Sequence, residues 1–159
     1  MVAPILRKFS KRVPAPLLRR LLNMWPPFVG AGISIREASE DLLHIRVELK
    51  RSWYNINYVG VQFGGSIYAM VDPFYMLMLI HNLGDEYIVW DKAAEMQFLR
   101  PGRTALTAMF NLDRELLDQI RTHTSQGGKF VFDLLVEVRD AENTIVALVT
   151  KTLYVRRKK

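Results

Sequence analysis

Alternation of apolar and polar residues predicts most of the secondary structure of this chain. It is clearest over residues 43–50, where every second residue from Leu43 to Leu49 is apolar and those between are charged or His. Such alternation is typical of a β-strand with one face on a core and the other in water. Five further strands are predicted at residues 29–35, 88–98, 106–112, 130–138 and 144–155. Over residues 88–98 the apolar positions share one parity, with Lys92 as the exception.

Two other segments follow the spacing of a short helix. Apolar residues at spacings of three and four mark residues 17–25, and Pro26 and Pro27 directly after them are expected to end this helix. A second short helix is expected from Arg114 onward, closed by Gly127 and Gly128. Residues 39–42 are expected to form the turn between the first two strands.

Residues 64–83 are apolar on nearly all sides, which is typical of a core helix or of a membrane span. A span would place Asp72 near the middle of the bilayer, at a cost of about 2.5–3.5 kcal/mol. Because amphipathic strands flank the segment, a core helix is the better interpretation, and no transmembrane span is expected. Pro73 removes the hydrogen bond to the Ala69 carbonyl and is therefore expected to kink the helix.

The order of these elements predicts the fold. Six strands of antiparallel type cannot cover their apolar face alone, and the helix at residues 64–83 is the obvious element to cover it. We therefore expect an α+β fold in which a six-stranded curved antiparallel sheet wraps around one long core helix. The length of 159 residues predicts a single domain over residues 1–159, with a basic arm at residues 1–16 and an N-terminal helix at residues 17–25.

The composition narrows the classes of function. Half of the residues are hydrophobic, which argues against disorder. The chain has no cysteine, so a disulfide framework and a thiolate metal site are excluded, and a reducing compartment such as the cytoplasm fits. The three histidines match no metal-ligand spacing, and there is no phosphate-binding loop, so neither a metal nor a bound cofactor is expected.

The net charge of +6 is concentrated at the two ends of the chain. Seven Lys or Arg residues precede the first acidic residue, Glu37, and the last four residues are all basic. Such ends suit an anionic partner, which would be a phosphorylated ligand, a nucleic acid or an anionic membrane; solvated tails are the other interpretation. No nucleic-acid motif accompanies the charge, so nucleic acid is not expected as a partner.

A set of motifs in the middle of the chain resembles the hotdog-fold thioesterase superfamily. Acyl-CoA thioesterases of the phenylacetate-pathway type carry an Asn, a Gly, a His-Gly-Gly and then an acid. The matching residues here are Asn57, Gly60, Phe63-Gly64-Gly65 and Asp72, and residues 97–102 (QFLRPG) match a strand-ending motif of the same group. Residues 89–92 and 151–158 are closer to the uncharacterised DUF4442 subgroup. The chain departs from the thioesterases at Phe63, where they carry His, and at Pro73.

The resemblance implies that the chain is an acyl-CoA thioesterase. In this interpretation the backbone N–H of Gly65, next to Gly64 at the helix start, stabilises the oxyanion. Asp72 would be the general base or the nucleophile, and Asn57 would orient the water or the thioester carbonyl. A carboxylate that merely pairs with a cation is the structural alternative for Asp72.

The spacing of Gly65 and Asp72 adds a constraint on assembly. Seven residues span about 10 Å of helix, whereas a hydrogen bond reaches only about 3 Å, so one chain cannot bring both residues to one thioester carbon. The site is therefore expected to combine two chains, in a homodimer or homotetramer. The alternative function is a non-catalytic hotdog protein that binds acyl-CoA or another acyl ligand.

Four residues are expected to bind the substrate: Phe63, Arg100, Arg103 and Lys92. The two arginines, together with Lys151, would hold the phosphates of CoA, which enters as part of the substrate; solvated strand ends are the simpler explanation of these residues. Lys92 either faces the helix and pairs with Asp72 or is turned outward by a strand bulge.

Overall fold

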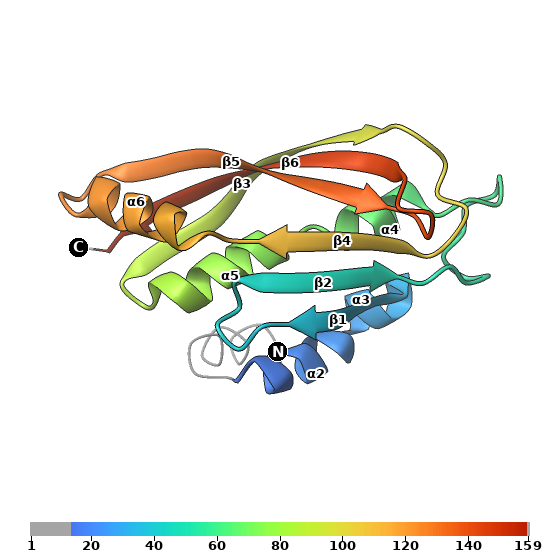
Figure 1. Ribbon diagram of the computed structural model, residues 1–159, viewed down its shortest axis with the longest axis horizontal. Helices are drawn as coiled ribbons and strands as arrows, with labels where there is room; N and C mark the ends of the chain where they lie inside the picture. The colour runs from blue at the N-terminus through green and yellow to red at the C-terminus, as the bar shows by residue number, and fades with distance from the viewer. Residues whose placement is uncertain (1–13, 159) are drawn as a thin grey trace.

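The structure is a computed structural model that describes residues 14–158 (Figure 1). Its strands are β1 (Ile33–Ala38), β2 (His44–Leu49), β3 (Tyr87–Phe98), β4 (Leu106–Asn111), β5 (Lys129–Arg139) and β6 (Ile145–Arg157). Its helices are α2 (Ala15–Asn23), α3 (Pro26–Ala31), α4 (Gly64–Ala69), α5 (Phe74–Leu83) and α6 (Arg114–Thr124). Most of the predicted basic arm at residues 1–16 lies outside the described residues. Within residues 14–158, no helix has the length and apolar character needed to cross a membrane.

The six strands form one antiparallel sheet in the order β1-β2-β4-β5-β6-β3, which curves around the helices (Figure 1). Alternate residues of β2 are buried, as the sequence predicted. Aromatic rings connect the helices to the sheet, since Phe74 of α5 lies 5.7 Å from Phe28 of α3 and 4.9 Å from Phe110 of β4 between ring centres. All three rings are buried. The predicted α+β fold, with a curved antiparallel sheet around a helical core, is confirmed.

The helical core at residues 64–83 consists of two helices with a break between them. α4 ends at Ala69 and α5 begins at Phe74, and the intervening residues include Asp72 and Pro73. Proline has no N–H to donate, so the hydrogen bond that the sequence predicted to be lost at Pro73 is absent. Regular bonding resumes when the N–H of Leu77 donates to the Pro73 carbonyl at 2.9 Å. The expected kink is therefore a full break, and it places Asp72 between the two helices.

Two helices, rather than one, precede the sheet. The sequence predicted that Pro26 and Pro27 end a helix and that a strand follows from residue 29, but these prolines begin α3. Proline is well tolerated in the first turn of a helix, because the N–H groups there have no acceptor within the helix. Gly32, with φ of 77°, ends α3, so β1 starts only at Ile33 and the predicted strand was wrong over residues 29–32.

Helix α2 covers the free edge of the sheet at β1. The side-chain nitrogen of Asn23 donates to the Ile35 carbonyl at 3.1 Å, and its oxygen accepts the Ile35 N–H at 2.7 Å. This side chain therefore pairs with the strand edge as another strand would. α2 is thereby held in one orientation on the sheet.

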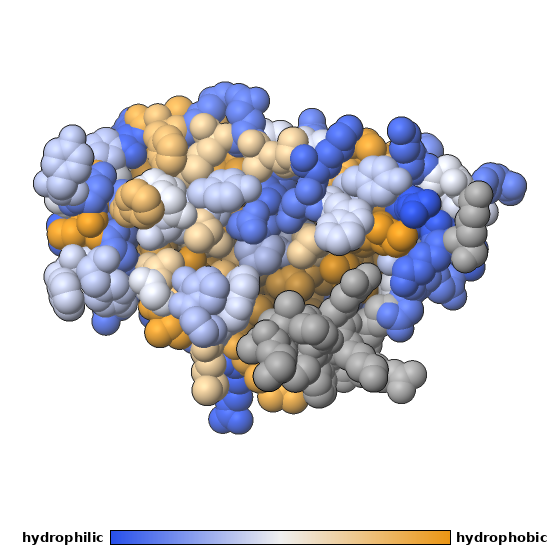
Figure 2. All heavy atoms as spheres, turned by 180° about the vertical axis from the view of Figure 1, so that it is seen from behind, coloured by the Kyte–Doolittle hydropathy of each residue, from blue (hydrophilic) through white to orange (hydrophobic). Residues whose placement is uncertain are grey.

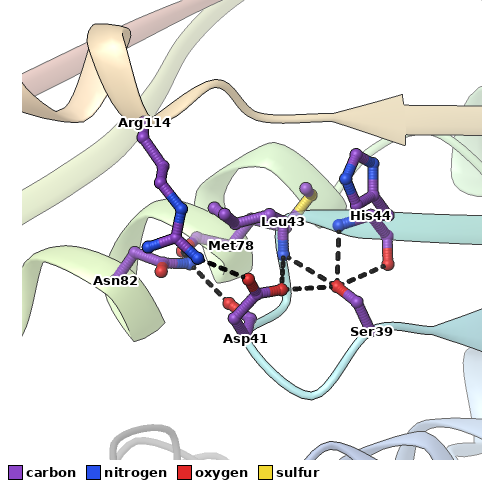
Figure 3. Close-up of polar contacts among 7 residues, drawn as sticks. All are labelled: Ser39, Asp41, Leu43, His44, Met78, Asn82 and Arg114. Carbon is purple, nitrogen blue, oxygen red and sulfur yellow. Dashed lines mark hydrogen bonds and ion pairs between the residues drawn. The ribbon is translucent and has the colours of Figure 1, made fainter.

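Asp41 stabilises the turn between β1 and β2 and connects it to two helices (Figure 3). The Ser39 hydroxyl donates to Asp41 Oδ1 at 2.7 Å and accepts the Leu43 N–H at 3.1 Å. Arg114 in α6 donates to Asp41 Oδ2 at 2.9 Å, and Asn82 in α5 donates to the Asp41 carbonyl at 3.0 Å. The pKa of Asp41 is lowered by the Ser39 hydroxyl most of all, then by the Leu43 N–H, which also donates to Oδ1 at 3.2 Å, and by the charge of Arg114.

Replacing Asp41 by Asn should reduce stability at neutral pH and not in acid. A carboxylate whose pKa is lower in the folded than in the unfolded chain stabilises the fold above the unfolded pKa, and this contribution is lost as the pH falls through the folded pKa. Because the side chain is 42% exposed, we expect a loss of only about 1 kcal/mol at pH 7. Urea unfolding of wild type and Asp41→Asn at a series of pH values measures it.

The matched control for this prediction is Asp118→Asn. The Asp118 carboxylate pairs with Arg121 on the surface of α6 and is 73% exposed. Its replacement should change the unfolding free energy little at any pH. A loss in Asp41→Asn that is the same at low and neutral pH would contradict the role given to the Asp41 carboxylate.

Strands β4 and β5 are joined only over a short length. Two residue pairs connect them, at Thr107 and Ala108 of β4. Beyond these pairs the strands diverge, with the segment that carries α6 connecting them (Figure 1). Tyr75 of α5 bridges the two strands, because its hydroxyl donates to the Leu135 carbonyl of β5 at 3.3 Å and its ring lies edge-on to Phe110 of β4, 5.2 Å away.

Candidate functional site

Asp72 pairs with a lysine that is distant in the sequence. Nζ of Lys151 on β6 donates to Oδ1 of Asp72 at 2.9 Å and lies 3.4 Å from Oδ1 of Asp91 on β3. The Lys151 side chain is 1% exposed, that of Asp91 21% and that of Asp72 49%. The ion group therefore runs from the protein interior to the surface, with Asp72 at the accessible end.

A single buried cation faces two carboxylates in this group. An unpaired charge in the interior is strongly unfavourable, so the two aspartates are what makes a charged Lys151 possible there. Burial raises the pKa of Asp91; the charge of Lys151 opposes this, and the charge of Asp72 adds to it. Within residues 14–158, Oδ1 of Asp91 has no hydrogen bond of good geometry. The charge of Lys151 is thus the interaction that favours the ionised form of Asp91 against burial and the charge of Asp72.

Tyr68 lies beside the accessible end of the ion group. It precedes Asp72 by four residues. The Lys151 ammonium lies 5.6 Å from the centre of its ring. Burial raises the pKa of the Tyr68 hydroxyl, the charge of Lys151 lowers it, and the charge of Asp72 and a hydrogen bond to that carboxylate raise it. The phenol therefore remains protonated at neutral pH and offers a hydrogen-bond donor next to Asp72.

Lys92 is not the cation that pairs with Asp72. Asp91 lies opposite Leu153 and Ala93 opposite Thr152, so Lys92 is the extra residue of a bulge in β3 and its side chain is exposed. Of the two alternatives for Lys92, the outward bulge is confirmed. The bulge also reverses the parity of the strand: Val89 before it is buried, whereas Trp90, which the pattern placed with the later apolar residues, is exposed.

The importance of Lys151 was missed, although the sequence contains a signal for it. From the sequence, Lys151 was expected only to contact the phosphates of CoA. Lys151 shares its parity with Val149, Leu153 and Val155, which are all buried in β6. A lysine at an inward position of an otherwise apolar strand predicts a buried ion pair, because such a charge needs a partner. Asp72, 79 residues earlier, is that partner.

Gly64 and Gly65 begin α4 between two open pockets. Gly64 lines a pocket of about 380 Å³ together with Asn57 and Arg100. Gly65 lines a pocket of about 420 Å³ together with Phe63. The structure thus brings these five predicted residues together around the helix start. Asp72 is not among the residues that line either pocket.

Two of these residues have local roles in the loop and at the helix start. The Asn57 side-chain oxygen accepts the N–H groups of Val59 and Val61 at 3.1 and 3.2 Å, so it shapes the loop before α4. The ring of Phe63 lies over Gly65, since a Cβ atom on Gly65 would be 2.4 Å from Cε1 of that ring. Phe63 is 54% exposed, so its ring has room to move away.

The candidate ligand-binding charges lie at the surface. Arg100 is exposed and lines the first pocket, whereas Arg103 is exposed and lines neither of the two pockets. Both are suited to binding phosphate groups, which arginine recognises through its planar fork of donors. In the part of the chain that the structure describes, no three His, Asp or Glu side chains are grouped in a way that could hold a metal ion.

Comparison with family models relates the chain to one family. The model described as a domain of unknown function (DUF4442) matches residues 15–155. A comparison with curated protein sequences gave no match.

Several solved structures share the fold. A protein of unknown function from Pseudomonas aeruginosa, PA5026, described as a probable thioesterase, superposes with a TM-score of 0.83 at 18% identity, over 94% of this chain and 99% of that one. The thioesterase HI1161 from Haemophilus influenzae has a TM-score of 0.65 at 22% identity, over 93% and 94% of the two chains. The PaaI protein of the Escherichia coli phenylacetic acid degradation operon has a TM-score of 0.60 at 18% identity, over 89% and 91%. The fold is therefore the hotdog fold.

Proposed function

This chain belongs to the DUF4442 family of domains of unknown function, and we propose that it is an acyl-CoA thioesterase. One observation carries the proposal: the Asp72 carboxylate is half exposed, and the ammonium of the buried Lys151 binds one of its oxygens. A general base needs a fixed orientation and an open side toward its substrate, and this arrangement provides both. Weaker support comes from solved structures of the same fold. PA5026 is described as a probable thioesterase, HI1161 is described as a thioesterase, and PaaI belongs to a phenylacetic acid degradation operon.

Two routes are open to the Asp72 carboxylate. As a base, it removes a proton from water while the water oxygen attacks the thioester carbon, and the C–S bond breaks to release CoA as the thiolate, which then takes up the proton. As a nucleophile, it attacks the carbonyl itself and expels CoA, and water then hydrolyses the resulting anhydride. In both routes Lys151 binds one carboxylate oxygen and leaves the other free to react. Tyr68 adds a hydrogen-bond donor beside the Asp72 carboxylate.

The start of α4 supplies the other half of the proposed site. The first N–H groups of a helix have no acceptor within the helix, and Gly65 is the second residue of α4. Its N–H is our proposed donor to the oxyanion, with Gly64 and Asn57 beside it. Arg100, Arg103 and the outward Lys92 would contact the phosphates of CoA, and the Phe63 ring would contact the substrate next to Gly65.

We propose that the reaction takes place between two copies of the chain. Gly65 lines a pocket at the start of α4, whereas Asp72 lines neither of the two pockets there, so one copy does not bring the two residues together. We expect the second copy to pack against the edge strand β3. β3 is an edge strand 12 residues long, and long free edges invite pairing with another strand. Trp90 and Phe98 on this strand are both 58% exposed, and Tyr68 near Asp72 is 38% exposed. Figure 2 shows hydrophobic atoms in a hollow near the middle of the face seen from behind.

A non-catalytic protein that binds acyl-CoA or another acyl ligand is the second candidate. The position of Phe63 favours it, because its ring covers the glycine that should offer the oxyanion donor. The ion pair of Asp72 and Lys151 would then only stabilise the fold.

Incubation of the purified chain with a panel of acyl-CoA esters separates the two candidates. Release of free CoA with saturation kinetics is the expected result, and sedimentation should show at least a dimer. Saturable binding of acyl-CoA without release of CoA would support the binding protein instead. A monomer that hydrolyses the esters would contradict the shared site.

Gly65→Ala should lower turnover by about tenfold or more if its N–H contacts the oxyanion. The added methyl group would displace the Phe63 ring and obstruct the approach of a carbonyl to the backbone. The double variant Phe63→Ala with Gly65→Ala relieves the overlap with the ring and should recover only part of the activity. Steady-state kinetics on the best substrate of the panel measures both.

Gly30→Ala is the matched control for this prediction. Gly30 lines the same pocket, and a Cβ atom there would meet nothing within 4 Å. Its turnover should remain close to wild type. Unchanged turnover in Gly65→Ala would contradict a close approach of the thioester carbonyl to this part of the backbone.

A further inference from the structure

The segment that connects β3 to β4 (residues 99–105) is fastened to the start of α4 through one buried residue. Gln62, which is 2% exposed, lies two residues before the helix begins. Its backbone N–H donates to the Gly102 carbonyl at 2.9 Å, and its side-chain Nε2 donates to the Thr104 carbonyl at 3.1 Å. These two carbonyls belong to the residues on either side of Arg103. Gln62 therefore holds the connecting segment at two points.

Gln62 does more than fill space in the core. Its Nε2 also donates to the Leu49 carbonyl at the end of β2, at 3.4 Å, whereas its Oε1 has no hydrogen-bond partner within residues 14–158. A buried polar atom without a partner costs free energy, and an apolar side chain of similar size would avoid that cost. The amide is therefore explained by the two carbonyl groups that its Nε2 binds.

Gln62 also lies at the pocket of about 380 Å³ next to the start of α4. Gly64 of the helix and Arg100 of the connecting segment line this pocket together with Gln62. On the other side of the segment, the N–H of Arg100 donates to the Val146 carbonyl at 3.1 Å. The backbone that carries Arg100 and Arg103 is thus anchored both before and after these two residues. In Figure 1 the connecting segment and α4 lie at the same end of the molecule.

We propose that Gln62 is a positioning residue that holds Arg100 and Arg103 at a fixed distance from the start of α4, in register with the phosphates of a bound acyl-CoA. This inference rests on the proposed function, in which the thioester lies at Gly65 and the arginines contact CoA. A segment whose backbone is already ordered loses less conformational entropy when its side chains bind a ligand. Arginine recognises phosphate through a planar fork of donors, so its binding depends on orientation as well as on charge.

Steady-state kinetics of Gln62→Met on two substrates tests the proposal. Methionine has a similar unbranched shape and no amide. The KM for an acyl-CoA should rise about tenfold, because the segment must then be ordered on binding, whereas kcat should stay within about twofold. The acyl ester of pantetheine has the same thioester and the same arm without the phosphates, so its KM should not change. The Kd of free CoA, measured by calorimetry, should rise as KM does and requires no hydrolysis.

Asn23→Leu is the matched control. It removes a partly buried amide that also binds backbone groups, those of Ile35, and that lines neither pocket at the start of α4. Both variants should lower the unfolding midpoint, but only Gln62→Met should change the ratio of the two KM values. If Gln62→Met does not fold, Gly102→Ala takes its place. A Cβ atom on Gly102 would lie 3.2 Å from Cβ and Cγ of Gln62, so the segment should shift and KM for acyl-CoA alone should rise.

The outcomes distinguish this inference from the proposed hydrolysis. Absence of turnover on both substrates, with a Kd for CoA that rises in Gln62→Met, would contradict the thioesterase and support the role of Gln62. An unchanged Kd for CoA in the folded variant, or an equal loss on both substrates, would overturn the inference and leave the thioesterase standing. A wild-type chain that neither turns over acyl-CoA nor binds CoA would overturn both.

Discussion

The variant Asp72→Asn is expected to hydrolyse acyl-CoA about 10²–10⁴-fold more slowly than wild type, the range by which a positioned general base accelerates a reaction. Asparagine has the same shape but can neither take up a proton from water nor attack a thioester. It can still accept a hydrogen bond from Lys151, so the local structure should persist. The rate of CoA release at saturating substrate is the measurement that decides.

Two further measurements make this result interpretable. Asp133→Asn is the control, because Asp133 on β5 accepts a hydrogen bond from Thr152 at 2.6 Å, next to Lys151 in the sequence. Its turnover should match wild type. Substrate affinity should be nearly unchanged in Asp72→Asn, because the loss concerns the chemical step. Equal turnover in wild type and Asp72→Asn would remove Asp72 from the mechanism.

The variant Lys151→Met should be the most destabilising single change in this region, by about 3 kcal/mol. Methionine keeps the apolar stem and most of the length of the side chain and removes the charge that compensates Asp91 in the interior. Asp72 contributes less to the loss, because it is half exposed and keeps contact with water. Turnover should also fall, since Asp72 loses the donor that orients it. Chemical unfolding near neutral pH measures the first effect.

The pH dependence of Lys151→Met identifies the cause. Burial already raises the pKa of Asp91, and removal of Lys151 would raise it further. An acid whose folded pKa lies above its unfolded pKa destabilises the fold when ionised, so the deficit should shrink as the pH falls through the folded pKa. Adding Asp91→Asn to Lys151→Met should recover part of the lost stability. A loss no larger than that of Lys129→Met, at an exposed position of β5, would contradict this account.

Periodicity predicted the sheet well because the strands of this fold have one buried and one wet face. Periodicity did not locate the bulge in β3. The bulge is nevertheless visible in the sequence, because Lys92 interrupts the alternation of apolar residues there. The prolines after α2 were misread because proline ends one helix and begins the next with equal ease. Its effect depends on whether the following residues find packing partners, as Phe28 does.

The candidate site was harder to predict than the fold. Asp72 stood out because it interrupts an apolar segment, and the structure shows why a carboxylate is possible there. Its partner, Lys151, lies on a strand formed at the other end of the chain. Spacing rules act within one element and do not reach across 79 residues. The sequence does show that Asp72 and Lys151 each lie at an inward position of an apolar element. Only the topology of the sheet shows that the two residues meet.

The short junction of β4 and β5 has a mechanical consequence. Two three-stranded ribbons, β1-β2-β4 and β5-β6-β3, meet along a seam of two residue pairs. Bending about such a seam strains few backbone hydrogen bonds, so side-chain contacts across it matter more here than between the other strand pairs. Tyr75 contacts both ribbons, through its hydrogen bond to Leu135 and its ring contact with Phe110, and so connects them where the backbone does not.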